Sequence, residues 1–186
     1  HWQYLLNPEA INYSLTERTG YLLMQSSKTI LNEAKPLSFI GRRQTEHDFQ
    51  ASTAFEFISD KEHEEAGMTL FQTSFHHYDF FLRRKGKGYV VQLRAMVGSL
   101  NYIVAEKEIS TNKVELKIKG TALEYQFGYI DAKNGAYITI GKIDTRYLST
   151  EVAGGFTGVM IGLYSTSNGH KTKAHAFYDW FDYATN

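Results

Sequence analysis

The sequence predicts an all-β protein, an antiparallel two-sheet β-sandwich with jelly-roll connections. Apolar and polar residues alternate with period two over most of the chain, which is typical of strands with one buried face. Only 2 prolines interrupt this pattern, and aromatic residues make up 15% of the chain, as a well-packed β core requires. About a dozen short strands separated by turn signals favour two packed sheets.

The expected strands follow from this alternation. Residues 49, 51, 53, 55 and 57 share one face, and residues 114, 116 and 118 alternate with charged neighbours. The full set, in chain order, is Tyr21–Gln25, Phe39–Arg43, Phe49–Phe57, Met68–Thr73, Tyr78–Arg84, Tyr89–Ala95, Tyr102–Glu106, Val114–Lys119, Leu123–Tyr129, residues 138–140, Thr157–Thr166 and His175–Tyr183.

Glycines mark the turns between these strands. Gly86 and Gly88 read as the tip of a hairpin, and Asn134-Gly135 is a strong hairpin signal because both residues tolerate positive φ. Helix signals are sparse. We expect one polar turn at Asp60–Glu65, exposed to solvent, and a second helical turn at Thr145–Leu148.

Length and composition limit the kind of protein. The 186 residues fit a single domain, 1–186, with no interdomain linker. Lys+Arg and Asp+Glu number 20 each, which argues against a nucleic-acid partner. No apolar run is long enough for a membrane span, and the first ten residues lack signal-peptide features. The absence of cysteine excludes disulfides and is consistent with a cytoplasmic location.

Several kinds of catalytic or metal site find no support in the sequence. The neighbouring His76 and His77 point to opposite faces of a strand, and no histidine spacing converges on a zinc ion. The motifs G-x-S-x-G and G-x-G-x-x-G are missing. Two carboxylates suffice for glycoside hydrolysis, but no pair stands out among the acidic residues on the predicted strands.

Residues 149–165 are the most distinctive segment of the chain. Gly154 and Gly155 form a flexible bend that carries one aromatic residue, Phe156, directly before an apolar strand. Two interpretations remain open on local pattern alone. Phe156 either folds back into the core of its own domain or reaches across to another surface.

Two further positions carry a functional hypothesis beside a structural one. Arg42 and Arg43 either bind an anion or a sugar carboxylate, or are simply an inward and an outward strand residue. Asp179, between Tyr178 and Trp180, either contributes oxygen to a Ca²⁺ ion or is a solvated strand residue.

Five segments together resemble the C-terminal β-sandwich of glycoside hydrolase family 43 β-xylosidases and α-arabinofuranosidases. They occur in the family's order over nearly the whole chain, and the fourth is highly specific. The segments are Trp2–Met24, Phe39–Gln44, Glu64–Gln72, Tyr147–Asn168 and Phe177–Tyr183.

The resemblance implies a concanavalin A-like fold packed against a five-bladed propeller that carries three catalytic carboxylates. It also implies that Phe156, on the bend of Gly154 and Gly155, helps to wall the substrate pocket of that propeller. Asp179 matches a calcium ligand of the family, but the acidic strand that supplies a second ligand upstream of Trp2 has no counterpart here. Family 43 enzymes are frequently oligomers, so a homo-oligomer is expected as well.

These observations lead to one hypothesis and two alternatives. The chain is expected to be an accessory domain of a xylan or xylo-oligosaccharide glycosidase, with no hydrolytic activity and no catalytic residue of its own. The first alternative is a free-standing carbohydrate-binding module. The second is an enzyme that uses its own pair of carboxylates.

Overall fold

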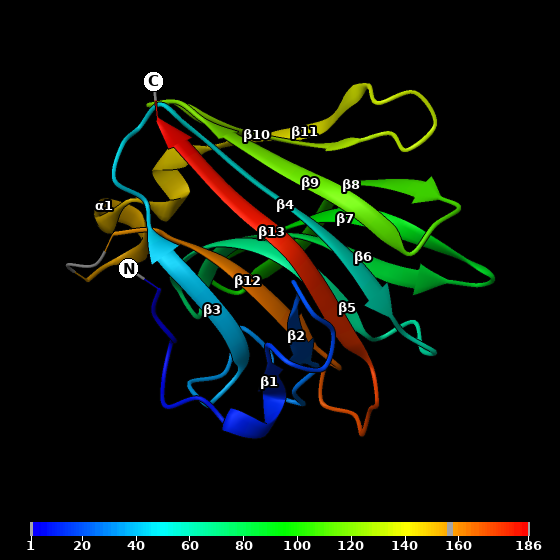
Figure 1. Ribbon diagram of the computed structural model, residues 1–186. Coiled ribbons are helices and arrows are strands. Elements are labelled where there is room, and N and C mark those ends of the chain that lie inside the picture. The colour runs from blue at the N-terminus through cyan, green and yellow to red at the C-terminus, as the bar shows by residue number, and fades with distance from the viewer. Residues whose placement is uncertain (1, 156–157, 186) are drawn as a thin grey trace.

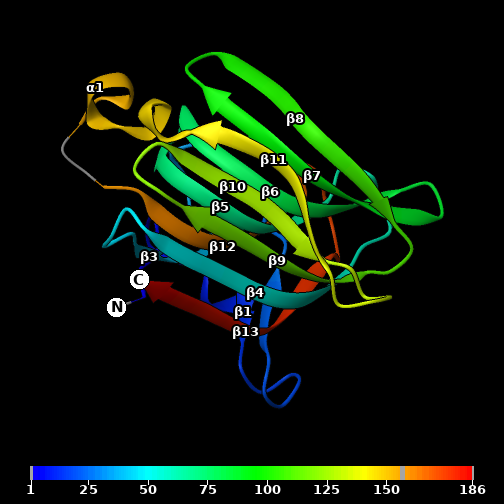
Figure 2. The same ribbon diagram turned by 90° about the horizontal axis from the view of Figure 1, so that it is seen from above.

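The computed structural model describes residues 2–155 and 158–185, and they form two antiparallel sheets packed face to face (Figure 1). The predicted all-β sandwich is therefore confirmed. Figure 2, seen from above, shows the two layers and the short helical segments at one end.

Within the described residues, one sheet has seven strands and the other has six. The seven-stranded sheet has the order β1 (Tyr13–Ser14), β2 (Leu22–Gln25), β13 (His175–Thr185), β4 (Phe49–Ile58), β9 (Lys113–Gly120), β10 (Glu124–Ile130) and β11 (Tyr137–Asp144). The six-stranded sheet has the order β3 (Ser38–Arg43), β12 (Met160–Thr166), β5 (Glu65–Thr73), β6 (His76–Lys85), β7 (Gly88–Val97) and β8 (Leu100–Ile109).

The main core lies between the two sheets. On β4, the predicted inward face is buried, with Phe55 and Phe57 at 3% and 0% exposure. Leu116 of β9 and Phe80 of β6 meet them from the neighbouring strand and the opposite sheet. Because each fully buried side chain of this size contributes about 1.5–3 kcal/mol, the alternation seen in the sequence is sufficient to hold the layers together.

A second apolar cluster covers the outer face of the six-stranded sheet. Leu31 and Leu37, from the connection between β2 and β3, pack with Phe39, Phe81 and Tyr164. This connection and the N-terminal segment therefore occupy much of a sheet face that would otherwise be open.

The short helical elements are η1 (Ala10–Asn12), η2 (Thr145–Leu148) and α1 (Thr150–Ala153). The predicted turn at Thr145–Leu148 is confirmed as η2, whereas α1 was not predicted. The strand expected at Thr157–Thr166 is observed from Met160 onward, and Thr157 lies outside the described residues. No helix in the described part of the chain is long and apolar enough to cross a membrane.

The hairpin predicted at Asn134-Gly135 is confirmed, since β10 and β11 pair on either side of it. Only the turn geometry differs: Gly135 has φ 69° but Asn134 does not have a positive φ, so this is not a turn with two left-handed residues. The Asp131 carbonyl accepts hydrogen bonds from both residues instead, which makes a longer loop. The prediction of a solvent-exposed helical turn at Asp60–Glu65 is wrong, because the segment is a non-helical turn whose last two carboxylates, Glu64 and Glu65, are buried.

Candidate functional site

The double-glycine bend lies at one end of the sandwich, which we call the loop end. It is formed by residues 44–48, 73–75, 98–100, 121–123 and 145–155 together with Gly158. Strand register places these connections together, since Met160 of β12 faces Arg43 on one side and Phe71 on the other. The two sheets are joined here by a hydrogen bond of 2.7 Å from the Tyr78 hydroxyl to the Asp144 carbonyl.

The chain enters the bend through η2 and α1. The Asp144 side chain accepts a hydrogen bond from the Arg146 amide and caps η2. Ser149 occupies the N-cap position of α1, where its side chain makes no capping hydrogen bond. Gly154 then ends α1 with φ 75° and ψ 175°, and Gly155 follows with φ 79°. Such backbone angles favour glycine strongly, which explains why the sequence has two glycines here. Phe156, the aromatic residue of this prediction, lies outside the described residues.

A cleft of about 750 Å³ lies at the foot of the bend, between residues 44–47, η2 and α1. On one side the Tyr125 hydroxyl donates a hydrogen bond of 2.9 Å to Gln44 Oε1. Burial raises the pKa of Tyr125 to about 12, so this phenol remains a neutral donor at ordinary pH. Charged and titratable side chains line the cleft: Glu46, His47, Arg146 and Glu151.

Large apolar side chains are exposed around the same end. Phe75 is 58% exposed on the turn between β5 and β6, and Leu123 is 78% exposed between β9 and β10. Leu100, at the start of β8, and Val152, on α1, are exposed as well. These four connections share one end of the sandwich, so the loop end carries several exposed apolar side chains.

Asp179 lies on β13, the third strand of the seven-stranded sheet. It is the residue at which β13 shifts register against β4, between Tyr178 and Trp180. Its side chain is exposed and lines a small groove with Arg18 and Glu56. The Arg18 guanidinium forms an ion pair of 2.7 Å with Glu56. Among residues 2–155 and 158–185, no group of three or more acidic or histidine side chains is placed to hold a metal ion.

The donor set around Asp179 therefore does not by itself fit calcium. Calcium binding requires six to eight oxygen ligands, whereas this groove offers Asp179 beside a guanidinium that already pairs with the neighbouring carboxylate. Calcium at this position stays a prediction.

Asp179 also borders a second groove of about 750 Å³, which we call the aromatic groove. It lies between the N-terminal segment, β2 and β13, and the Trp2 ring packs edge-on against Phe181 at 5.0 Å. Its aromatic lining includes partly exposed rings: Trp2, Tyr4, Tyr21 and Trp180.

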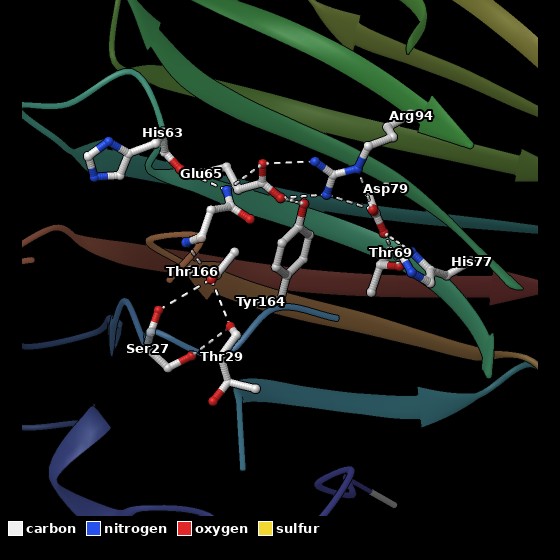
Figure 3. A network of polar contacts seen from close by, with 11 residues as sticks. Ser27, Thr29, His63, Glu65, Thr69, His77, Asp79, Arg94, Tyr164 and Thr166 are labelled. Carbon is white, nitrogen blue, oxygen red and sulfur yellow. Dashed lines mark hydrogen bonds and ion pairs between the residues drawn. The ribbon is translucent and has the colours of Figure 1, made fainter. Parts of the chain in front are cut away.

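A buried network of charges, which sequence reasoning missed, lies on the outer face of the six-stranded sheet. Figure 3 shows Arg94 of β7 between Glu65 of β5 and Asp79 of β6. Arg94 donates two hydrogen bonds to Glu65, at 3.0 and 2.6 Å, and two to Asp79, at 2.9 and 2.7 Å. Tyr164 also donates to Glu65, at 2.9 Å.

Asp79 is fully buried at the centre of this network. Thr69 Oγ1 and His77 Nδ1 both lie 2.8 Å from its Oδ1 atom. Burial alone would raise the pKa of Asp79, but the interactions with His77 and Arg94 outweigh burial and hold that pKa well below its ordinary value. Because these carboxylates are saturated with internal partners, the network is structural and does not supply a catalytic pair.

The adjacent histidines and arginines have separate environments. His77 is buried beside Asp79 while His76 is only partly buried, as expected for neighbours on opposite strand faces. The Arg42 guanidinium lies 3.9 Å above the ring of Tyr183, and Arg43 donates to the Gly158 carbonyl. Both arginines thus have contacts within the domain.

The two packed antiparallel sheets form a concanavalin A-like sandwich. The family model of the β-xylosidase C-terminal concanavalin A-like domain matches residues 1–184. The chain belongs to this family.

Individual relatives agree with this assignment. A non-reducing end α-L-arabinofuranosidase of Bacteroides ovatus is 34% identical over 183 residues, which cover 98% of this chain and 34% of that protein. A xylosidase/arabinosidase of Butyrivibrio fibrisolvens is 30% identical over 169 residues, which cover 91% of this chain and 32% of that protein. The chain thus spans about a third of the length of these relatives.

Solved structures give the same result. A Bacteroides ovatus protein described as xyloglucan PUL GH43B superposes over 100% of this chain and 36% of its own, with a TM-score of 0.94 and 33% identity. The GH43 protein BlXynB of Bacillus licheniformis superposes over 100% of this chain and 37% of its own, with a TM-score of 0.90 and 25% identity.

Proposed function

We propose that this chain is the accessory domain of a family 43 glycosidase that cleaves xylose- or arabinose-containing oligosaccharides. Its partner is a five-bladed propeller that carries the catalytic carboxylates. The observation that carries the proposal is the loop end, where a bend restricted to glycine and several exposed apolar side chains lie at the same end of the sandwich. The relatives support it, because the matched region covers only about a third of each and the remainder is about twice the length of this chain.

Phe156, on the bend after Gly154 and Gly155, is proposed to form part of the wall of the propeller's substrate pocket. An apolar ring at the mouth of a pocket excludes water and blocks longer chains, which favours cleavage at the end of small oligosaccharides. The exposed residues Phe75, Leu123 and Val152 would then lie in the interface with the propeller.

Phe156→Ala in the glycosidase that contains this chain tests the proposal. We expect kcat/KM to fall about tenfold or more and chain-length preference to relax, because positioning and water exclusion would be lost at the pocket. The free energy of unfolding should change by less than about 0.5 kcal/mol, as for a surface substitution. A loss of several kcal/mol would instead show that Phe156 belongs to the core.

The aromatic groove supports a second candidate function, that of a carbohydrate-binding module. Trp2, Tyr21 and Trp180 line the groove beside Asp179. Tyr21 has one ring face covered by the Arg18 guanidinium, so Trp180 is the ring chosen for the test. Calorimetry with xylo-oligosaccharides separates the two functions. A binding module should bind them unaided with about −5 to −6 kcal/mol and lose binding in Trp180→Ala, whereas the accessory domain should show no heat of binding.

The structural calcium, the cytoplasmic location and a homo-oligomer stay predictions. For calcium, the melting temperature should be compared in calcium and in chelator for the wild type and for Asp179→Asn. A chelator-induced decrease in the wild type that is absent in Asp179→Asn would support the ion, and equal melting temperatures in both conditions would contradict it.

A further inference from the structure

We propose that Arg43 is a positioning residue for the double-glycine bend. Its guanidinium holds the Gly158 carbonyl and thereby fixes the point at which the chain leaves the bend for β12. This inference rests on the proposed function of Phe156, and its test is designed so that the two can fail separately.

The entrance to the bend is fixed by backbone hydrogen bonds. The amide of Ala153 donates to the Ser149 carbonyl at 2.8 Å, and the amide of Gly154 donates to the Thr150 carbonyl at 3.0 Å. Together with the restricted angles of Gly154, these bonds set the direction in which the chain departs from α1.

The chain that follows the bend, at Gly158 and Val159, is held by one backbone hydrogen bond and one side chain. Backbone contact between β3 and the chain leading into β12 ends where the Gln44 amide donates to the Val159 carbonyl at 2.9 Å. One residue earlier, the Gly158 carbonyl accepts a hydrogen bond of 2.6 Å from Arg43 Nη1. A charged donor makes this hydrogen bond stronger than one between neutral groups. Through Arg43, β3 therefore contacts the chain one residue closer to the bend than its backbone does.

The two neighbouring arginines consequently have different roles. Arg42 points to the other face of β3, where its guanidinium lies over Tyr183. Arg43 is exposed and donates to the Gly158 carbonyl, three residues after Gly155. Arg43 thus has a partner within the domain, whereas the buried Nε atom of Arg42 has no hydrogen-bond partner among the described residues, so the anion interpretation stays a prediction for Arg42.

The test compares Arg43→Met, Phe156→Ala and the double variant in the glycosidase that contains this chain. Arg43→Met should lower kcat/KM about tenfold through displacement of the bend, with little change in melting temperature. In the Phe156→Ala background it should cause no further loss, because residues that act through one another are not additive. Arg43→Lys, which keeps a cationic donor, should restore part of the activity.

Arg84→Met is the matched control. Arg84 also donates to a backbone carbonyl, that of Ser59 at 3.4 Å, but in the β6–β7 hairpin at the other end of the sandwich. Its activity should equal that of the wild type.

The outcomes separate the two claims. If Phe156→Ala impairs the enzyme while Arg43→Met does not, or if their losses simply add, the role of Arg43 is wrong and the proposed function stands. If Phe156→Ala has no effect on kcat/KM or chain-length preference, the proposed function is wrong and the inference with it.

Discussion

At the scale of single residues, Arg94 is the shared partner of two buried carboxylates. Its guanidinium balances two carboxylates, Glu65 and Asp79, that are 3% and 0% exposed. A buried ion cluster of this kind adds little net stability relative to apolar residues, but it becomes costly when one partner is removed. The cluster therefore fixes how β5, β6 and β7 align.

Arg94→Met should lower the free energy of unfolding by about 3–5 kcal/mol, because two buried carboxylates would lose their counter-charge. Urea denaturation monitored by tryptophan fluorescence measures the change. Lys85→Met is the control, since Lys85 pairs with Glu106 at the surface, where solvent screens the ion pair and its removal costs little stability. Equal losses in the two variants would contradict the assignment of Arg94 as the central charge.

Acid should destabilise the domain through Asp79. Its pKa is lowered by folding, so its stabilising contribution is complete above the unfolded value of about 4 and is lost as pH falls toward the folded value. Melting temperatures between pH 6 and pH 2 should therefore fall below about pH 4. Asp79→Asn should show a smaller fall over that range, and a fall as steep as that of the wild type would assign the acid sensitivity to other groups.

At the scale of elements, the sequence indicates the strands well because each strand alternates over its own length. Phe49, Phe55 and Phe57 are inward-facing as the pattern predicts, and η2 begins at the expected residue. The pairing of Glu65 with Arg94 could not be predicted, because 29 residues separate them and each looks like an exposed charge locally. At Asp60–Glu65 this reason applies to Glu65 only. The buried Glu64 accepts hydrogen bonds from the Ser59 hydroxyl and the Asp60 and Lys61 amides, which are close in sequence.

The bend after α1 was predictable from its glycines, but its geometry was not. Gly154→Ala should cost about 1–3 kcal/mol, because φ 75° with ψ 175° is strained for any residue with a Cβ atom. No neighbouring atom lies within 4 Å of a Cβ placed there, so the cost is one of backbone conformation.

Gly88→Ala is the control for this prediction. The nearest atom to its Cβ atom would be the Ile109 carbonyl oxygen at 3.4 Å, and Gly88 is not among the glycines with positive φ. Thermal unfolding should distinguish the two variants. Equal melting temperatures would show that the Gly154 conformation does not restrict the residue type.

At the scale of the whole molecule, the described residues place buried charges on the outer face of the six-stranded sheet and exposed apolar side chains at one end. The outer face of the six-stranded sheet is occupied by Leu31, Leu37 and the Arg94 network. The loop end instead exposes Phe75, Leu100 and Leu123. The sequence could predict the family and the fold, but not this distribution, because it depends on which connections meet at the same end of the sandwich.

The central claim is that this domain shapes the active site of a partner and does not hydrolyse glycosides itself. The most direct measurement adds the chain to a separately prepared family 43 catalytic propeller and follows hydrolysis of nitrophenyl xyloside and arabinofuranoside. We predict no turnover by the chain alone and an increase in the propeller's kcat/KM with wild-type chain that Phe156→Ala does not produce. Hydrolysis by the purified chain alone, or equal activation by both forms, would contradict the claim.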